Sequence, residues 1–183
     1  MECKAALVEA KGDIAEAEVI LRKKGIARAS GKATRATKQG VIGTYIHPGA
    51  QLGVLIEVNC ESDFVARTDD FQGLVHDLAM QVAAADPQFL RKEDVTEAAL
   101  AKERDIQRAR ALAEGKPEKM VDKIVEGRMN KFYEEVCLME QPFIKENTTT
   151  ITDLIKSKIA KLGENISVSR FVRFKVGDTA PAE

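Results

Sequence analysis

The fold is decided by residues 40–59, which read GVIGTYIHPGAQLGVLIEVN. Two runs of apolar and β-branched residues flank the pair Pro48-Gly49, which is a strong turn signal. In the second run every other residue is a large aliphatic one, a spacing that places these side chains on one face of a strand. They are Leu52, Val54, Ile56 and Val58. The segment therefore predicts an antiparallel β-hairpin.

The strand pattern stops within residues 57–67, EVNCESDFVAR, and the acid–aromatic pair Asp63-Phe64 lies at this stop. Polar and aromatic groups at a junction between rigid elements are well placed to touch a partner. Common structural roles are the alternative, a cap or turn for Asp63 and a core position for Phe64. On the residues alone those roles are favoured, and His47, next to the hairpin turn, is likewise interpreted as a solvated turn residue.

Helical patterns follow the junction. An amphipathic stripe predicts a helix that ends at Asp86-Pro87, and its apolar members are Phe71, Leu74, Val75, Leu78, Ala79 and Val82. Residues 94–136 predict a projecting helical hairpin, or coiled coil, because Asp94 and Glu97 match a capping box and residues 115–117, Gly-Lys-Pro, match a stop and restart. Its second helix contains Gly127, which we expect to admit another backbone at close range. The expected apolar steps of that helix are Met120, Ile124, Phe132 and Val136.

The last part of the chain supplies a helix and a third strand. Thr150 with Asp153 is expected to begin the helix, and Gly163 to close it. The strand pattern that follows places alternate apolar residues on one face, namely Ile166, Val168, Val172, Phe174 and Val176. One distant strand added to a local hairpin predicts an antiparallel three-stranded sheet packed with helices, an α+β fold.

The N-terminal part predicts a small helical unit and a basic linker. Asp13 with Glu16 matches a capping box, and Gly25 is a natural helix stop. Two short helices bury little surface, so the unit is incomplete. The chain has no acid between Glu18 and Glu57, and residues 22–38 are rich in Lys and Arg. No aromatic side chain interleaves these charges to stack on bases, which favours a linker over a nucleic-acid patch.

These signals divide the chain into six segments. They are a partial N-terminal helical domain (1–27), a basic linker (28–39), a core hairpin and helix (40–93), a helical hairpin (94–136), a core helix and closing strand (137–177) and a tail (178–183). The tail is expected to fray, as chain ends commonly do.

Composition narrows the class of protein. The 183 residues are 44% hydrophobic and 31% charged, with a formal net charge of −1, which predicts a globular protein and argues against a general polyanion binder. Three scattered cysteines predict neither a disulfide framework nor a zinc site and favour a reducing compartment. Neither a signal peptide nor an apolar run of about 20 residues is present. We expect a soluble, intracellular protein.

Catalytic patterns are missing from the sequence. His47 and His76 are the two histidines, and neither lies beside a residue that it would activate as a nucleophile. No Gly-rich phosphate loop and no metal-ligand spacing occurs. The sequence therefore predicts no enzyme, no cofactor and no nucleotide site of its own.

Several motifs, in order along residues 1–177, resemble the elongation factor Ts family. The junction residues 62–66, SDFVA, are similar to the family's Thr-Asp-Phe-Val-Ala signature, with Ser62 in place of Thr. Further resemblances are MECKAAL at 1–7, GTYIH at 43–47, LGVL at 52–55, GKP at 115–117, EGRM at 126–129, QPF at 141–143 and FVRFKVG at 171–177. Because these motifs are independent of one another, the chain is identified as resembling this family.

The resemblance implies guanine nucleotide exchange on elongation factor Tu in its GDP-bound and nucleotide-free forms, without covalent chemistry. The implied exchange residues are Ser62, Asp63, Phe64 and Val65, with the aromatic ring entering near the partner's magnesium and nucleotide site. The hairpin histidine, His47, is implied to approach the same GTPase domain. The coiled coil and the core are implied to make further contacts. The implied location is the bacterial cytoplasm or an organelle matrix or stroma.

Two departures from longer family members stand out. The chain starts where the family's N-terminal three-helix domain, similar to a ubiquitin-associated fold, is already under way, so truncation or a wrong start is expected. It also has one hairpin-based core module where longer members have two, which suggests a homodimer. Two other functions stay open on the residues: an RNA- or ribosome-associated module that uses residues 22–38, and a coiled-coil adaptor that uses residues 94–136.

Overall fold

A computed structural model of the chain describes residues 2–178, apart from the side chains of Glu2, Arg22, Ile26 and Arg28. Contacts divide it into two compact units, one that runs to Ala83 and resumes at Thr152, and one formed by Ala84–Ile151. Of the expected tail, only residue 178 lies within the described residues. In the described part of the chain no helix combines the length and apolar character that a membrane span requires.

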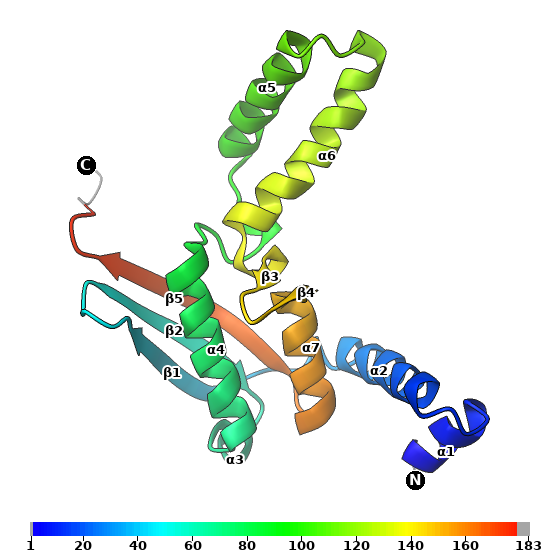
Figure 1. The fold of residues 1–183 in the computed structure, drawn as a ribbon. Coiled ribbons are helices and arrows are strands. Elements are labelled where there is room, and N and C mark those ends of the chain that lie inside the picture. Colours follow the sequence, from blue (N-terminus) through cyan, green and yellow to red (C-terminus); the bar gives the residue numbers. More distant parts are fainter. Residues whose placement is uncertain (1, 179–183) are drawn as a thin grey trace. The chain divides into compact units, whose positions relative to one another are not determined.

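An antiparallel three-stranded sheet forms the centre of the first unit (Figure 1). Its strands are β1 (Gln39–Ile46), β2 (Leu52–Cys60) and β5 (Ile166–Lys175), in the order β1-β2-β5. The hairpin pairs Gln39 with Cys60 and Ile46 with Gly53, while β5 adds to the other edge of β2. The predicted three-stranded antiparallel sheet and the α+β fold class are confirmed.

Helix α4 (Asp69–Ala85) covers one face of this sheet (Figure 1). Every member of the predicted apolar stripe is buried, as are Val54, Ile56 and Val58 of β2. A Cβ atom placed on Gly43 of β1 would collide with the side chain of Val75. The absence of a side chain at Gly43 therefore lets α4 approach the strand closely.

The predicted face of the closing strand is correct for its first half only. Ile166 and Val168 are buried, but Val172, Phe174 and Val176 are exposed. The register of β2 with β5 shifts by one residue, since Glu57 pairs with Arg170 and Val58 with Val168. This β-bulge inserts Ser169 and reverses the facing of the residues beyond it. The second half of β5 therefore adds its apolar residues to the sheet face opposite α4.

Besides α4 and the one-turn helix α3 (Asp63–Ala66), this unit contains α1 (Glu2–Glu9), α2 (Ile14–Ser30) and α7 (Ile151–Leu162, within the unit from Thr152). Asp13 caps α2 as predicted, its carboxylate accepting the backbone N–H of Glu16 at 3.0 Å. Gly25, however, does not end α2. A Cβ on Gly25 would lie 3.1 Å from Cβ of Ala160 in α7, so the glycine provides a close approach between two helices.

The second unit is built around an antiparallel helix pair, α5 (Glu97–Ala113) and α6 (Glu118–Val136). Its other elements are η1 (Lys92–Asp94), η2 (Leu138–Glu140), β3 (Pro142–Phe143) and β4 (Glu146–Thr150). The break at residues 114–117 agrees with the predicted stop and restart, with Gly115 at φ +72° and Pro117 as the N-cap of α6. The predicted start at Asp94 is wrong, because Thr96 caps α5 by accepting the N–H of Ala99.

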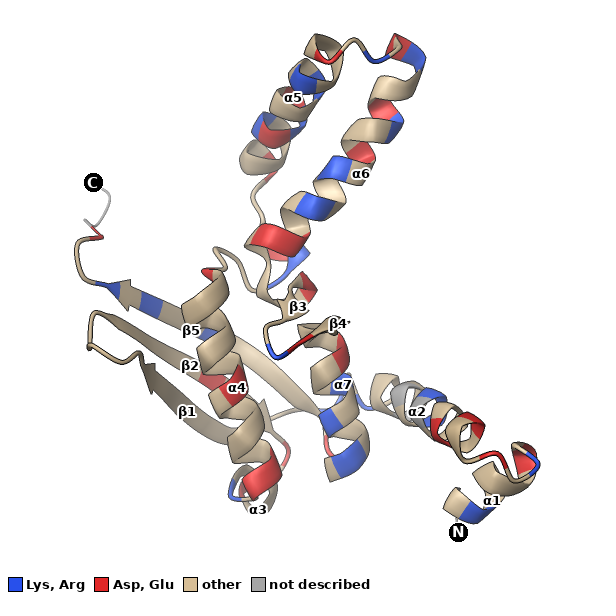
Figure 2. Ribbon diagram, in the orientation of Figure 1, with Lys and Arg blue, Asp and Glu red and all other residues tan. Residues whose placement is uncertain are grey.

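The helix pair buries only a narrow apolar seam, and both helices carry Lys and Arg interspersed with Asp and Glu (Figure 2). In α6 the buried residues are Val121, Met129 and Val136, whereas the predicted Met120 is exposed. Ion pairs join the helices, Arg108 to Asp122 and Arg128 to Glu114. Nothing among the described residues lies within 4 Å of a Cβ on Gly127, so no other part of the chain uses the expected close approach there.

Two glycines of the first unit give a matched test of this packing. We predict that Gly43→Ala lowers the free energy of unfolding by about 1–3 kcal/mol, because the added methyl meets Val75. Gly73→Ala should raise it by ~0.5–1 kcal/mol, since Gly73 lies within α4 with open space around it. Urea unfolding followed by circular dichroism measures both, and a neutral or stabilising Gly43→Ala would contradict the close packing of α4.

Candidate functional site

The candidate site begins at the junction after β2, where the one-turn helix α3 (Asp63–Ala66) is capped by Ser62. The Ser62 hydroxyl oxygen accepts the backbone N–H of Val65 at 3.3 Å. The N-cap is therefore Ser62 and not Asp63, which was the residue expected from the sequence. The Asp63 carboxylate instead accepts a hydrogen bond from Arg67 one turn later, at 2.9 Å on the exposed surface.

Phe64 projects to the outside of the protein. Its side chain is 78% exposed, while Val65 and Ala66 on the same turn are buried. A core position for Phe64 is therefore wrong. Val65 and Ala66 anchor the turn, and an exposed aromatic ring on an anchored turn is a typical contact residue in protein interfaces.

Glu164 holds this junction, and no sequence pattern predicts it. Its carboxylate accepts the backbone N–H of Ser62 at 3.0 Å and the Ser62 hydroxyl at 2.7 Å. Cys60 adds a weaker bond, its thiol donating to the carbonyl of Ser62 at 3.1 Å. Glu164 lies 102 positions from Ser62 along the chain, and no local pattern points to such a contact.

Cys60 is buried beside the junction, at the end of β2. Burial raises the pKa of its thiol, and the nearby negative charge of Glu164 raises it further. The neutral thiol is the form that donates to the Ser62 carbonyl. In the second unit, burial is again the main cause that raises the pKa of the Cys137 thiol, here to about 11.

His47 is not brought to the junction. It directly follows β1 at the turn of the hairpin, whereas Ser62 follows Cys60, which pairs with the opposite end of β1. The length of β1 separates them, roughly 26 Å at ~3.3 Å per residue. The imidazole Nδ1 of His47 lies 3.1 Å from the Tyr45 hydroxyl, and the Tyr45 ring also contacts His76 edge-on. The predicted site residues therefore form two separate groups.

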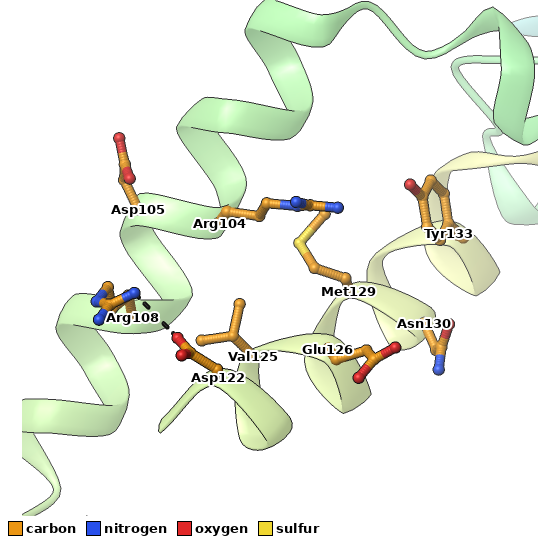
Figure 3. A pocket seen from close by; sticks show the side chains of 9 residues that line it. All are labelled: Arg104, Asp105, Arg108, Asp122, Val125, Glu126, Met129, Asn130 and Tyr133. Carbon is orange, nitrogen blue, oxygen red and sulfur yellow. Dashed lines mark hydrogen bonds and ion pairs between the residues drawn. The ribbon is translucent and has the colours of Figure 1, made fainter. Parts of the chain in front are cut away.

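The helix pair offers a different kind of surface, a groove of about 610 Å³ on one side of the α5–α6 seam (Figure 3). Met129 and Val125 line it together with charged residues, and Arg104 extends toward Met129. Arg108 and Asp122 bridge the two helices at 3.0 Å. The lining therefore combines both signs of charge with apolar side chains. Among the described residues no three His, Cys, Asp or Glu side chains gather as metal ligands would.

Known proteins resemble the chain over nearly its whole length. The family model described as Elongation factor TS matches residues 14–178. The Elongation factor Ts of Solibacter usitatus is 76% identical over 178 residues, which cover 97% of this chain and 84% of that protein. The Elongation factor Ts proteins of Koribacter versatilis and Moorella thermoacetica are 62% and 59% identical, again over 97% of this chain and over 81% and 88% of their own lengths.

The environments of the cysteines predict their reactivity. In the native protein at mildly alkaline pH we expect only the exposed Cys3 to react quickly with Ellman's reagent. Cys60 and Cys137 should react after unfolding, because burial and a raised pKa leave little thiolate. The absorbance of the released thiolate, with and without guanidinium chloride, counts the groups. A second fast thiol in the native protein would contradict the buried positions.

Proposed function

The chain belongs to the elongation factor Ts family, and from that membership we propose that it is a guanine nucleotide exchange factor for elongation factor Tu in protein biosynthesis. In this role it promotes GDP release during translation elongation by binding alone, without covalent chemistry. Since the relatives above come from bacteria, we place this activity in the bacterial cytoplasm.

The observation that carries the proposal is the exposure of Phe64 on an anchored turn, within the motif that resembles the family's signature. We call residues 62–65 the exchange edge. The Phe64 ring is 78% exposed in the free protein, so its burial by a partner would contribute a large part of the binding free energy. Asp63, exposed beside it, supplies a charge for orientation at the same contact.

The physical mechanism follows from how GTPases hold their nucleotide. Magnesium and the phosphates are bound by a preorganised set of ligands and donors. An inserted ring displaces those groups because packed protein elements repack rather than yield smoothly. Coupling is reciprocal. This protein lowers the affinity of the GTPase for GDP or GTP by a certain factor, and the bound nucleotide lowers the affinity of the GTPase for this protein by the same factor. Entry of GTP then releases the factor.

Other surfaces complete the proposed complex. His47 reaches the partner at a second point, a strand length from Phe64, and the α5–α6 pair contributes contacts through its mixed charges. The alternative of an RNA- or ribosome-associated module has weaker support, because basic side chains of residues 22–38 are used within the chain. Lys32 donates to the carbonyl of Gly163, and Arg35 lies 3.6 Å from Glu61.

A homodimer is the further part of this proposal. The sheet face opposite α4 is apolar and exposed, through Ile42, Ile46 and Leu55 of the hairpin and Val172, Phe174 and Val176. A shallow groove of about 610 Å³ runs over part of it. Antiparallel sheets normally present polar residues on a solvated face, and contiguous apolar patches mark interfaces. We assign this face to a second copy of the chain, packed by two-fold symmetry.

The central test is the substitution Phe64→Ala. We predict that it slows stimulated release of a fluorescent GDP analogue from elongation factor Tu at least tenfold, because the inserted ring is lost. Its free energy of unfolding should stay within ~0.5 kcal/mol of the wild type, since the side chain is exposed. Stopped-flow fluorescence measures the release, and urea unfolding measures the stability.

A comparison variant is His47→Ala, for which a smaller but measurable slowing is expected. Unchanged release in His47→Ala would remove His47 from the interface. Wild-type release in Phe64→Ala would contradict the exchange edge and favour an adaptor that binds through residues 94–136. An unfolded Phe64→Ala protein would show that the ring is needed for folding, contrary to its exposure.

Light scattering after gel filtration tests the dimer. The wild type should have twice the mass of one chain, and Phe174→Asp the mass of one chain, because a buried charge disrupts an apolar interface. Met120→Gln, a change at an exposed apolar residue of α6, should stay dimeric. A monomeric wild type would contradict the proposal. If the wild type is monomeric and Phe174→Asp no longer binds elongation factor Tu, the apolar face belongs to the interface with the GTPase.

A further inference from the structure

Two loops at one end of the sheet, one after β2 and one before β5, hold each other because a backbone N–H of each donates to a carboxylate of the other. Glu164 accepts the N–H of Ser62 at 3.0 Å, and Glu61 accepts the N–H of Asn165 at 2.6 Å. The register explains this geometry, because Cys60 pairs with Ile166. Residues just after β2 therefore face residues just before β5. We call this four-residue arrangement, Glu61, Ser62, Glu164 and Asn165, the latch.

A third segment is tied into the latch. The Asn165 side chain is almost fully buried, and its amide donates to the carbonyls of Ala33 and Arg35 at 3.3 and 2.7 Å. Arg35 also lies 3.6 Å from the Glu61 carboxylate. The segment that follows α2 is thus fixed to the same loop, which leaves the loop at residues 163–165 little freedom to move away from Ser62.

The helix that carries Phe64 depends on Ser62 for its conformation. A four-residue helix has almost no stability of its own, since nucleating a turn costs more than a single turn returns. A serine hydroxyl has one proton to donate. The Ser62 hydroxyl oxygen lies 2.7 Å from a carboxylate oxygen of Glu164, to which it donates, and it accepts the N–H of Val65. Donation to Glu164 orients the hydroxyl oxygen toward Val65. The carboxylate of Glu164 therefore sets the cap that sets the turn.

We propose that Glu164 is a positioning residue for nucleotide exchange, which holds Ser62 so that the turn at residues 63–66 presents Phe64 in its inserting orientation before the GTPase arrives. This inference rests on the proposed function. A contact that is already ordered in the free protein loses less conformational entropy on binding, so the entropic cost of forming the complex is smaller. Glu164 itself acts through Ser62 and Phe64.

The test is a set of exchange measurements on elongation factor Tu loaded with a fluorescent GDP analogue. Glu164→Ala should slow stimulated release about tenfold, as expected from loss of charge-assisted hydrogen bonds. Glu164→Gln keeps one of the two acceptor oxygens that Ser62 uses and loses the charge, so its release rate should lie between those of the wild type and Glu164→Ala. Asp70→Ala is the matched control, because Asp70 ties α4 to α7 through Lys161 at 2.7 Å without touching the latch, and it should leave release unchanged.

A positioning role predicts one further result that a general structural defect does not. In a Phe64→Ala background, Glu164→Ala should slow release no further, because its effect passes through Phe64. Additional slowing in that background, or wild-type release in Glu164→Ala alone, would overturn the proposal. If Glu164→Ala does not fold, Ser62→Ala removes the same hydroxyl link and is held to the same two outcomes.

A measurement without the GTPase separates this inference from the proposed function. With 4-fluorophenylalanine placed at position 64, the ¹⁹F line of the free protein should shift or broaden in Glu164→Ala and return toward the wild type in Glu164→Gln. An identical line in all three proteins would overturn the latch even if exchange is real. A wild-type chain that does not accelerate GDP release, with the line changed as expected, would contradict the function alone.

Discussion

The antiparallel pairing of β2 with β5 is the interaction on which the rest of the first unit depends. It joins residues more than a hundred positions apart and makes β2 a central strand, bonded on both edges. It completes the sheet against which α4 packs. Its register also brings residues 164–165 opposite residues 61–62. A weaker pairing would therefore loosen the core and the candidate site together, whereas the hairpin alone needs only local contacts.

Sequence patterns predict those features that neighbouring residues determine. The hairpin, the apolar stripe of α4 and the Gly115–Pro117 break depend on local periodicity and turn chemistry, and the structure confirms them. The facing of Phe174 could not be predicted, because the bulge at Ser169 arises in the pairing of two distant strands. The helix end predicted at Gly25 is wrong for a similar reason. A glycine is needed there because Ala160 of a distant helix lies close by. The N-cap at Thr96 was two residues from the predicted one.

The sequence indicated where the candidate site lies along the chain, but not which residues hold it in place. The residues at 62–65 lie where the strand pattern stops, yet only the three-dimensional fold shows that Phe64 is exposed and that Ser62 is the cap. His47, predicted in the same group, lies at the other end of β1. In the proposed function, residues 62–65 form an edge that carries an apolar ring, and His47 is a second contact point a strand length away.

The most direct test of the proposed exchange activity is the release of a fluorescent GDP analogue from elongation factor Tu, followed by stopped flow with and without this protein. If the protein is an exchange factor, release becomes faster in proportion to its concentration, until the rate saturates. Excess GDP added to the complex should in turn displace the protein, because the coupling is reciprocal. A release rate that does not change at any concentration of a folded chain would contradict the proposed exchange activity.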